Sequence, residues 1–347
     1  MLANMRLSLR APLSLTAAFA VGCTTPVVDD VADASGAMTE GVLLVERTIS
    51  ADGAAETNVS AKFMRLSTPA DPELAERIVG STLELPPVGA CRPTTTERVN
   101  GKTRALGSLG AIELIDVGDV TLRIHPLAPA QPGEAHAASV MSLAARAFPD
   151  VGDLVSGMFY TSRDATSDLP AGATYTLEGS GSALVDRFTI EAEAPAAPED
   201  VRVGDVALAD GPVLAAAESA LIHWRAAEAG DKGREDVVLV DVSASSGASV
   251  RCAFRDTGRA ALPAWVFDVG ALGPLPAVAL LAVHRVRERS FSVSGLDAGA
   301  VRFDLSVVGR VAVTTGPQAG PNPALPSQGA EPQPAPTVPI AAPAQQP

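Results

Sequence analysis

The sequence predicts an all-β protein built from two antiparallel β-sandwich domains in tandem, with few short helices. Apolar and polar residues alternate in several segments, such as Val120–Ile124 and Val301–Val307, as expected of strands with one buried and one wet face. Turn-forming residues separate such segments, for example Ala51–Gly53 and Asp116–Asp119. Many short strands divided by turns are typical of sandwiches, and an apolar content of 47% over 347 residues can supply their cores.

The composition disfavours two classes of partner. Acidic residues outnumber basic ones by 40 to 26, which gives a formal net charge of -14, whereas binding to nucleic-acid phosphates requires a basic face. Aromatic residues make up only 4% of the chain, which leaves little material for stacking on bases or sugars. We therefore expect no nucleic-acid partner.

The N-terminal residues 1–23 predict a secretory signal peptide. Arg6 and Arg10 form a positive start, and the apolar stretch Ala11–Val21 that follows is too short to span a bilayer. The segment ends in Ala20-Val21-Gly22-Cys23, which resembles the lipobox of bacterial lipoproteins, with Ala20 where that family usually has Leu. The resemblance implies that Cys23 is acylated and becomes the first residue of the mature chain.

An anchor of this kind implies a place in the cell envelope. Each buried methylene of an acyl chain contributes roughly 0.8 kcal/mol, so several chains together hold a protein stably at a membrane. Thr24 follows Cys23, and in the family an Asp at that position retains the protein in the inner membrane, so the resemblance implies delivery to the outer membrane. The open alternative is a plain signal peptide with Cys23 as a bystander.

Composition also divides the rest of the chain. Residues 24–40 predict a flexible acidic tether that reaches roughly 23 Å, and the Pro/Ala-rich residues 314–347 predict a disordered tail. Between them, the Pro-containing stretch Ala192–Asp200 suggests a boundary between an N-terminal domain, 41–192, and a C-terminal domain, 193–313. Residues 72–79 predict a short helix, and residues 137–147 fit a helix or a strand.

The C-terminal domain carries a second resemblance. Leu221–Trp224 predicts an early strand with a core Trp, and the motif Cys252-x-Phe254-x-Asp256-x-Gly258 follows. This part is similar to immunoglobulin or fibronectin type III-like sandwiches, and the motif resembles one in uncharacterised envelope lipoproteins of GC-rich Gram-negative bacteria. The resemblance implies a fold and brings no active site with it.

No catalytic constellation is present in the sequence. The hydrolase nucleophile elbow and the zinc-protease helix are missing, and Gly101-Lys102-Thr103 lacks the Gly at position 96 that a phosphate loop requires. The histidines are scattered, and His284 is interpreted as a hydrogen-bonded core residue. Two Asp pairs could offer oxygens to Ca²⁺, but calcium needs six to eight oxygens, so we interpret both pairs as turn residues; they are Asp116 with Asp119 and Asp150 with Asp153. We expect no catalytic residue, cofactor or metal.

Two further sets of residues were singled out. Cys91 and Cys252 remain after Cys23, and in an oxidising envelope they either form an interdomain disulfide or stay as buried thiols. Alternation predicts an outward basic set that is either an interaction surface or ordinary solvated side chains; it comprises Arg251, Arg255, Arg285, Arg287 and Arg302. The matching inward set comprises Val238, Val240, Val242, Val250, Cys252, Phe254, Phe303 and Leu305.

Taken together, these features predict a lipid-anchored, non-enzymatic envelope protein. Its membrane contact is the N-terminal lipid, and its sandwiches present surface to other envelope proteins. The alternative is a ligand- or glycan-binding surface lipoprotein, and an unrecognised hydrolase is a third option.

Overall fold

A computed structural model describes most of the chain between residues 37 and 315. The described ranges are 37–66, 79–80, 85–94, 112–126, 138–148, 155–162, 169–216, 218–227 and 236–315. All of them belong to one compact unit, residues 37–347. The expected signal peptide with Cys23, nearly all of the tether, residues 72–78 of the predicted helix and the tail from residue 316 lie outside the described ranges.

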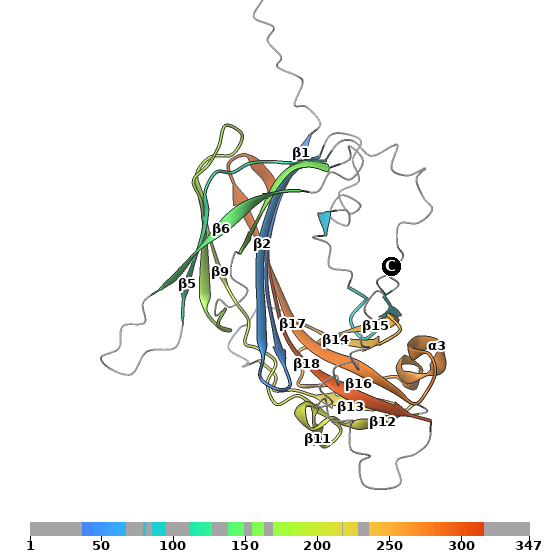
Figure 1. Ribbon diagram of the computed structural model, residues 1–347. Coiled ribbons are helices and arrows are strands. Elements are labelled where there is room, and N and C mark those ends of the chain that lie inside the picture. Colours follow the sequence, from blue (N-terminus) through green and yellow to red (C-terminus); the bar gives the residue numbers. More distant parts are fainter. Residues whose placement is uncertain are drawn as a thin grey trace, which may run out of the picture. The chain divides into compact units, whose positions relative to one another are not determined.

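The described residues are mostly β-strand, which confirms the predicted fold class (Figure 1). The strands are β1 (Met38–Ser50), β2 (Ala55–Leu66), β3 (Cys91–Pro93), β4 (Ile112–Leu114), β5 (Val120–His125), β6 (Ser139–Ala147), β7 (Val155–Ser162), β8 (Thr174–Gly179), β9 (Phe188–Glu193), β10 (Arg202–Val203), β11 (Val206–Ala207), β12 (Val213–Ala215), β13 (Ala220–His223), β14 (Val237–Ala244), β15 (Ser249–Arg255), β16 (Arg259–Leu262), β17 (Ala277–Val293) and β18 (Leu296–Thr314). Helical turns are η1 (Leu208–Asp210), η2 (Ala264–Phe267) and α3 (Val269–Leu272). The segment 137–147, which fits a helix or a strand by its sequence, contains strand β6.

The strands form two sheets. The large sheet has the order β3-β15-β14-β17-β18-β1-β2-β4-β7-β6-β5-β8-β9, with β12 also paired to β18, and the small sheet has the order β11-β10-β13-β16. Most pairs are antiparallel, as predicted, but β1 with β18, β12 with β18 and β4 with β7 are parallel. The sheet is mixed because these partners are not joined by hairpins, so antiparallel direction is not imposed on them.

Two hydrophobic cores lie along the large sheet. Core 1 is formed mainly by the inner faces of β1, β2, β5, β8 and β9, and core 2 fills the space between the small sheet and β14, β15 and β17. The long hairpin β17–β18 enters both, since Val301 and Phe303 belong to core 1 while Leu281 and Val311 belong to core 2. A tandem arrangement of two separate sandwiches is thus not confirmed, because strands from both sides of residue 192 share one sheet (Figure 1).

The inward residues predicted for the C-terminal half are confirmed. Seven of them are buried, from Val238 on β14 to Leu305 on β18, and Phe254 is half-buried against core 2. Alternation could be read correctly in β14, β15 and β18 because polar residues mark the opposite face of each strand.

Leu305 gives a direct test of this core. Leu305 is 1% exposed, so Leu305→Ala should lower the free energy of unfolding by about 2–5 kcal/mol, through lost transfer energy and the cavity left behind. Urea denaturation followed by far-UV circular dichroism measures it. Leu221→Ala, at an exposed position of the small sheet, is the control and should change stability little.

Candidate functional site

Two of the five arginines expected on the surface are buried, which corrects the predicted interaction set. Arg285 and Arg287 are 1% and 5% exposed. On β17 the inner face carries the odd-numbered residues, so these arginines continue the buried row of Ala279, Leu281 and Val283. The sequence pattern predicts the opposite, with Arg285 and Arg287 on the outer face of this strand. The two arginines lie inside because the chain opposite them offers carbonyl and carboxylate oxygens rather than apolar side chains.

Arg285 is held from three directions. Its Nη1 donates to the carbonyls of Ala196 at 2.9 Å and Ala197 at 3.0 Å, and its Nη2 donates to the carbonyl of Arg225 at 2.7 Å. The carboxylate of Asp256 lies 2.9 Å from Nε and completes an ion pair. The same carboxylate accepts a hydrogen bond from the indole nitrogen of Trp224 at 2.6 Å.

Arg287, two residues further along β17, is held in a similar way. Its Nε and Nη2 donate to the two carboxylate oxygens of Asp236 at 2.7 and 2.9 Å. Its Nη1 lies 3.4 Å from the carbonyl of Glu193 and 3.5 Å from that of Ala194. The two guanidinium groups therefore hold the segment from 193 to 197 against β17, where the sequence had suggested a free linker. Charge-assisted, two-pronged bonds of this kind are among the stronger interactions in proteins.

The Cys252-x-Phe254-x-Asp256-x-Gly258 motif has a structural role. Cys252 and Phe254 face core 2, and Asp256 binds Trp224 and Arg285. Gly258 has a φ of 80°, in the left-handed region that favours glycine, and its carbonyl accepts from the backbone N–H of Trp224 at 3.0 Å. The motif thus fixes one corner of core 2.

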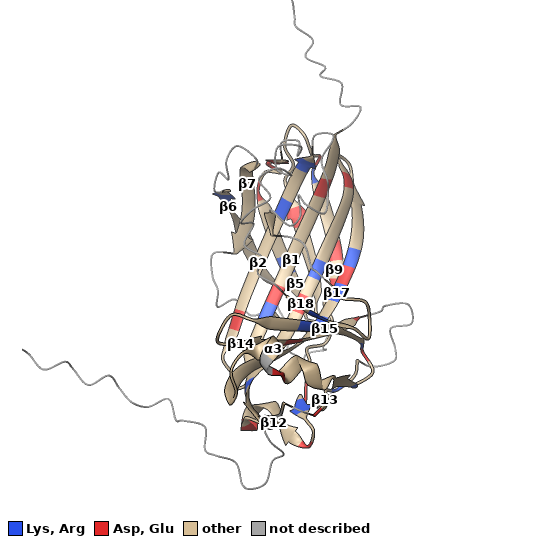
Figure 2. Ribbon diagram, turned by 90° about the vertical axis from the view of Figure 1, so that its right-hand side faces the viewer, with Lys and Arg blue, Asp and Glu red and all other residues tan. Residues whose placement is uncertain are grey.

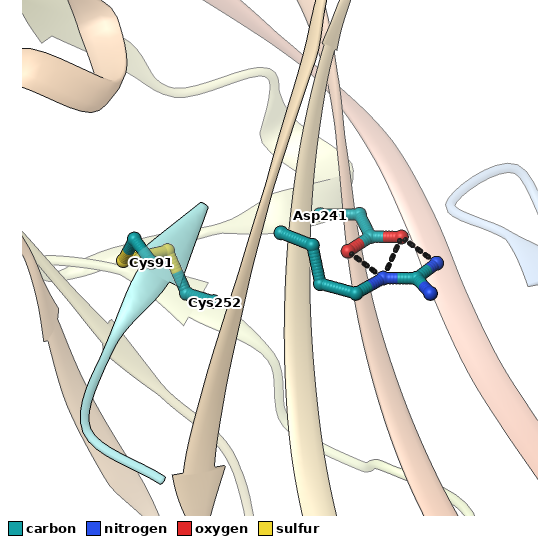
Figure 3. Close-up of a disulfide and its surroundings, with 4 residues drawn as sticks. Cys91, Asp241 and Cys252 are labelled. Atoms are coloured by element: carbon teal, nitrogen blue, oxygen red, sulfur yellow. Dashed lines mark hydrogen bonds and ion pairs between the residues drawn. A yellow bond between two sulfur atoms is a disulfide. The ribbon is translucent and has the colours of Figure 1, made fainter. Parts of the chain in front are cut away.

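The structure joins Cys91 to Cys252 in a disulfide (Figure 3). The two cysteines are directly opposed where the short strand β3 pairs with β15, and 161 positions separate them in the sequence. The bridge connects a segment from the N-terminal half of the chain to the edge of core 2.

The remaining arginines of the predicted set lie on the opposite face of the large sheet. Arg251 is half-buried and pairs with both oxygens of Asp241 at 2.7–3.2 Å (Figure 3). Arg302 pairs with Glu288 at 2.8 Å, and Arg255 is exposed. Acidic and basic positions occur on the same long strands (Figure 2). The five arginines therefore do not form one basic patch.

His284 lies in this charged layer, hydrogen-bonded as predicted but on the face opposite core 2. Its Nδ1 is 2.7 Å from Asp304 on β18, and its Nε2 is 3.7 Å from Asp241 on β14. Burial acts to lower the pKa of His284, but the hydrogen bond and charge of Asp304 and the charge of Asp241 outweigh it, and Arg251 opposes them weakly. The pKa of His284 is therefore raised above its usual value.

A raised histidine pKa makes part of the stability dependent on pH. Protonated His284 stabilises the fold fully below its unfolded pKa near 6.5, and this contribution is lost as the pH rises through the higher folded pKa. The difference in free energy of unfolding between the wild type and His284→Gln should thus shrink as the pH is raised from about 6 to about 9. Asp304→Asn should flatten this dependence, and a difference that grows with pH would contradict the assignment.

The Asp residues weighed as Ca²⁺ ligands act in a turn where the structure describes them. Asp116 accepts hydrogen bonds from the hydroxyl of Tyr160 at 2.6 Å and from the N–H of Gly118 at 2.8 Å, and these bonds lower the pKa of Asp116. Burial and the Asp116 bond raise the pKa of Tyr160. Asp150 and Asp153 lie outside the described residues. Within the described ranges, no three His, Cys, Asp or Glu side chains are grouped so as to hold a metal ion.

An open hollow of about 260 Å³ lies beside β5 and β8. Its lining consists of Asp119, Thr121, Glu178, Gly179, Ser180 and Arg187. Glu178 is also bonded to Arg123 at 3.0 Å, and no aromatic ring of the kind that stacks on sugars belongs to the lining. Of the two tryptophans, Trp224 is buried and Trp265 is exposed on η2.

Comparison with known proteins gives no family for this chain. No family model matches, and no curated protein matches significantly. Among solved structures, the Fcho1 mu homology domain of Danio rerio with bound Eps15 peptide is 8% identical, with a TM-score of 0.22 over 80% of this chain and 97% of that chain. The FN1–FN3 domains of chicken CNTN1 are 12% identical, with a TM-score of 0.17 over 73% of this chain and 75% of that chain. Similarity at this level indicates no function.

In the part of the chain that the structure describes, no helix has the length and apolar character needed to cross a bilayer.

Proposed function

We propose that the protein is a lipid-anchored, non-enzymatic component of the cell envelope. The observation that carries the proposal is the sequence Ala20-Val21-Gly22-Cys23 at the end of the apolar segment Ala11–Val21, which resembles a lipobox. The first strand begins at Met38, only 15 residues after Cys23. Even fully extended, that stretch spans at most about 50 Å, so an acylated Cys23 would keep the β-sheets close to the membrane.

The chemistry of the buried charges supports a structural role. The side chains that most resemble catalytic groups are Arg285, Arg287, His284 and Asp256, and each is occupied by contacts that hold strands together. Arg285 and Arg287 fix the segment after residue 193, and His284 bridges three neighbouring strands. Such networks are built to define one arrangement of the sheets.

We further propose that the sheets present their outer surfaces to other envelope proteins, at the outer membrane. Thr24 after Cys23 supports the outer-membrane assignment through the resemblance to bacterial lipoproteins. The excess of acidic residues supports a solvated surface that discourages non-specific association.

Acylation is tested by Cys23→Ser in the native host. The variant should lose incorporation of labelled palmitate and, in a high-salt wash that weakens electrostatic binding, move from the membrane fraction to the soluble fraction, because serine offers no thiol to carry the diacylglyceryl group. The conservative neighbour Thr24→Ser is the matched control and should keep both. Palmitate label retained by Cys23→Ser would overturn the proposal.

A further inference from the structure

We propose that the outer face of the small sheet is a docking surface for an anionic lipid bilayer. Its centre is a row of Arg202 on β10, His223 on β13 and Arg259 on β16, called here the basic row. The surface is distinct from Cys23 and from the arginine set considered above.

Strand pairing brings the three side chains together. Arg202 is directly paired with His223, and His223 with Arg259. Directly paired residues of antiparallel strands point to the same face, with Cβ atoms about 4.5–5.5 Å apart. The adjacent residues Val203, Ile222 and Ala260 are buried in core 2. The basic row therefore lies on the opposite, outer face, where Arg202 and Arg259 are exposed and His223 is half-buried.

The basic row has no acidic partner within the described residues. In the part of the chain that the structure describes, the side chains of Arg202, His223 and Arg259 make no hydrogen bond or ion pair, whereas the neighbouring Arg225 pairs with Glu199 and Asp200. Two arginines beside a histidine, in a chain of net charge -14, are thus arranged to meet an anion from outside.

The form of the surface favours a bilayer over a small anion. The row lies across three neighbouring strands, and the same face continues with Leu221, 43% exposed, paired to the exposed Ala261. Arginines beside an exposed aliphatic side chain match headgroup phosphates and the start of the acyl region.

The choice of a lipid source rests on the proposed function, since a chain acylated at Cys23 meets a bilayer by necessity. The basic row would hold the small sheet against the membrane and so fix which faces of the protein remain available to partners.

The test is co-sedimentation of the full chain carrying Cys23→Ser, which removes acylation from the measurement. Vesicles of phosphatidylcholine are compared with vesicles of equal parts phosphatidylcholine and phosphatidylglycerol. The chain should bind the anionic vesicles more tightly, and binding should weaken with added salt. Arg202→Glu/Arg259→Glu should reduce the anionic partition coefficient by roughly 25-fold or more, since each arginine near such a surface accounts for about fivefold.

The matched control is Arg146→Glu/Arg187→Glu, which makes the same change in net charge. Both arginines are exposed and lie in the part of the protein that surrounds core 1. It should retain most of the binding, and circular dichroism should show both double variants folded. Equal loss in both variants, or no preference for anionic vesicles in the parent chain that carries only Cys23→Ser, would overturn the proposal. Retention on an acidic polysaccharide resin that depends on Arg202 and Arg259, without vesicle binding, would also overturn it and point to a glycan. Neither result bears on acylation, which the palmitate experiment tests separately.

Discussion

Replacing Asp236 with Ala should lower the free energy of unfolding by about 3–5 kcal/mol, because the change leaves the guanidinium of Arg287 buried without its counter-charge. Arg287 would keep long contacts to the carbonyls of Glu193 and Ala194, at 3.4 and 3.5 Å, and a 4.0 Å approach to the Glu193 carboxylate. These cannot replace a two-pronged ion pair with both partners out of water. Chemical denaturation of the variant and the wild type gives the difference.

A double variant separates the ion pair from simple loss of packing. In Asp236→Ala/Arg287→Leu neither charge of this pair remains buried, so stability should recover a substantial part of what Asp236→Ala loses. Arg302→Leu is the comparison at a partly exposed pair, where we expect a loss of about 1 kcal/mol or less. If Asp236→Ala costs less than Arg302→Leu, Arg287 is reached by water and its burial is wrongly assigned.

Opening the Cys91–Cys252 disulfide should produce an effect of comparable size. The bridge closes a loop of 161 residues, and the chain-entropy model assigns up to about 5 kcal/mol to a loop of that length. Cys91→Ser/Cys252→Ser should therefore lower the denaturation midpoint strongly. Burial of Cys252 adds to the cost, since a serine hydroxyl there needs a hydrogen-bond partner.

Reductant supplies the control for the disulfide. A dithiol should lower the midpoint of the wild type toward that of the double variant and should leave the double variant unchanged. An unchanged wild-type midpoint, together with two free thiols counted in the native protein by alkylation, would show that the bridge does not form.

Local sequence pattern predicted the fold class and the buried faces of several strands. In β15 and β18 polar residues alternate with apolar ones, so the phase of burial is legible, as Cys252 and Phe303 show. In β17 the run Ala277–Val283 is apolar at every position, so either face could be the inner one. The sequence analysis takes the even-numbered face of this strand as the inner one, but its residues Val278 and Leu280 are exposed. This error in the phase of burial placed Arg285 and Arg287 on the wrong side of the sheet.

The candidate site depended on contacts that no local pattern encodes. Arg285 is stabilised inside by carbonyls 88 and 89 positions earlier, and Arg287 by Asp236, 51 positions earlier. A Pro-containing acidic stretch is typical of a linker, but here its carbonyls are the acceptors for the two guanidinium groups. The parallel pairing of β1 with β18 likewise joins the two ends of the described chain.

The basic row could not be predicted from the sequence, although all three of its residues are visible there. Arg202, His223 and Arg259 are unremarkable one by one, and only the register of three short strands places them side by side. The disulfide was one of two options from composition, and the pairing of β3 with β15 is what brings its two cysteines together.

The central claim, that Cys23 anchors the protein, is tested most directly by mass spectrometry of the N-terminal peptide from protein purified out of native membranes. The account predicts a mature chain that begins at Cys23, with a diacylglyceryl group on its sulfur and an acyl group on its amino nitrogen. A chain that begins at another residue, or that contains Cys23 with an unmodified thiol, would contradict it.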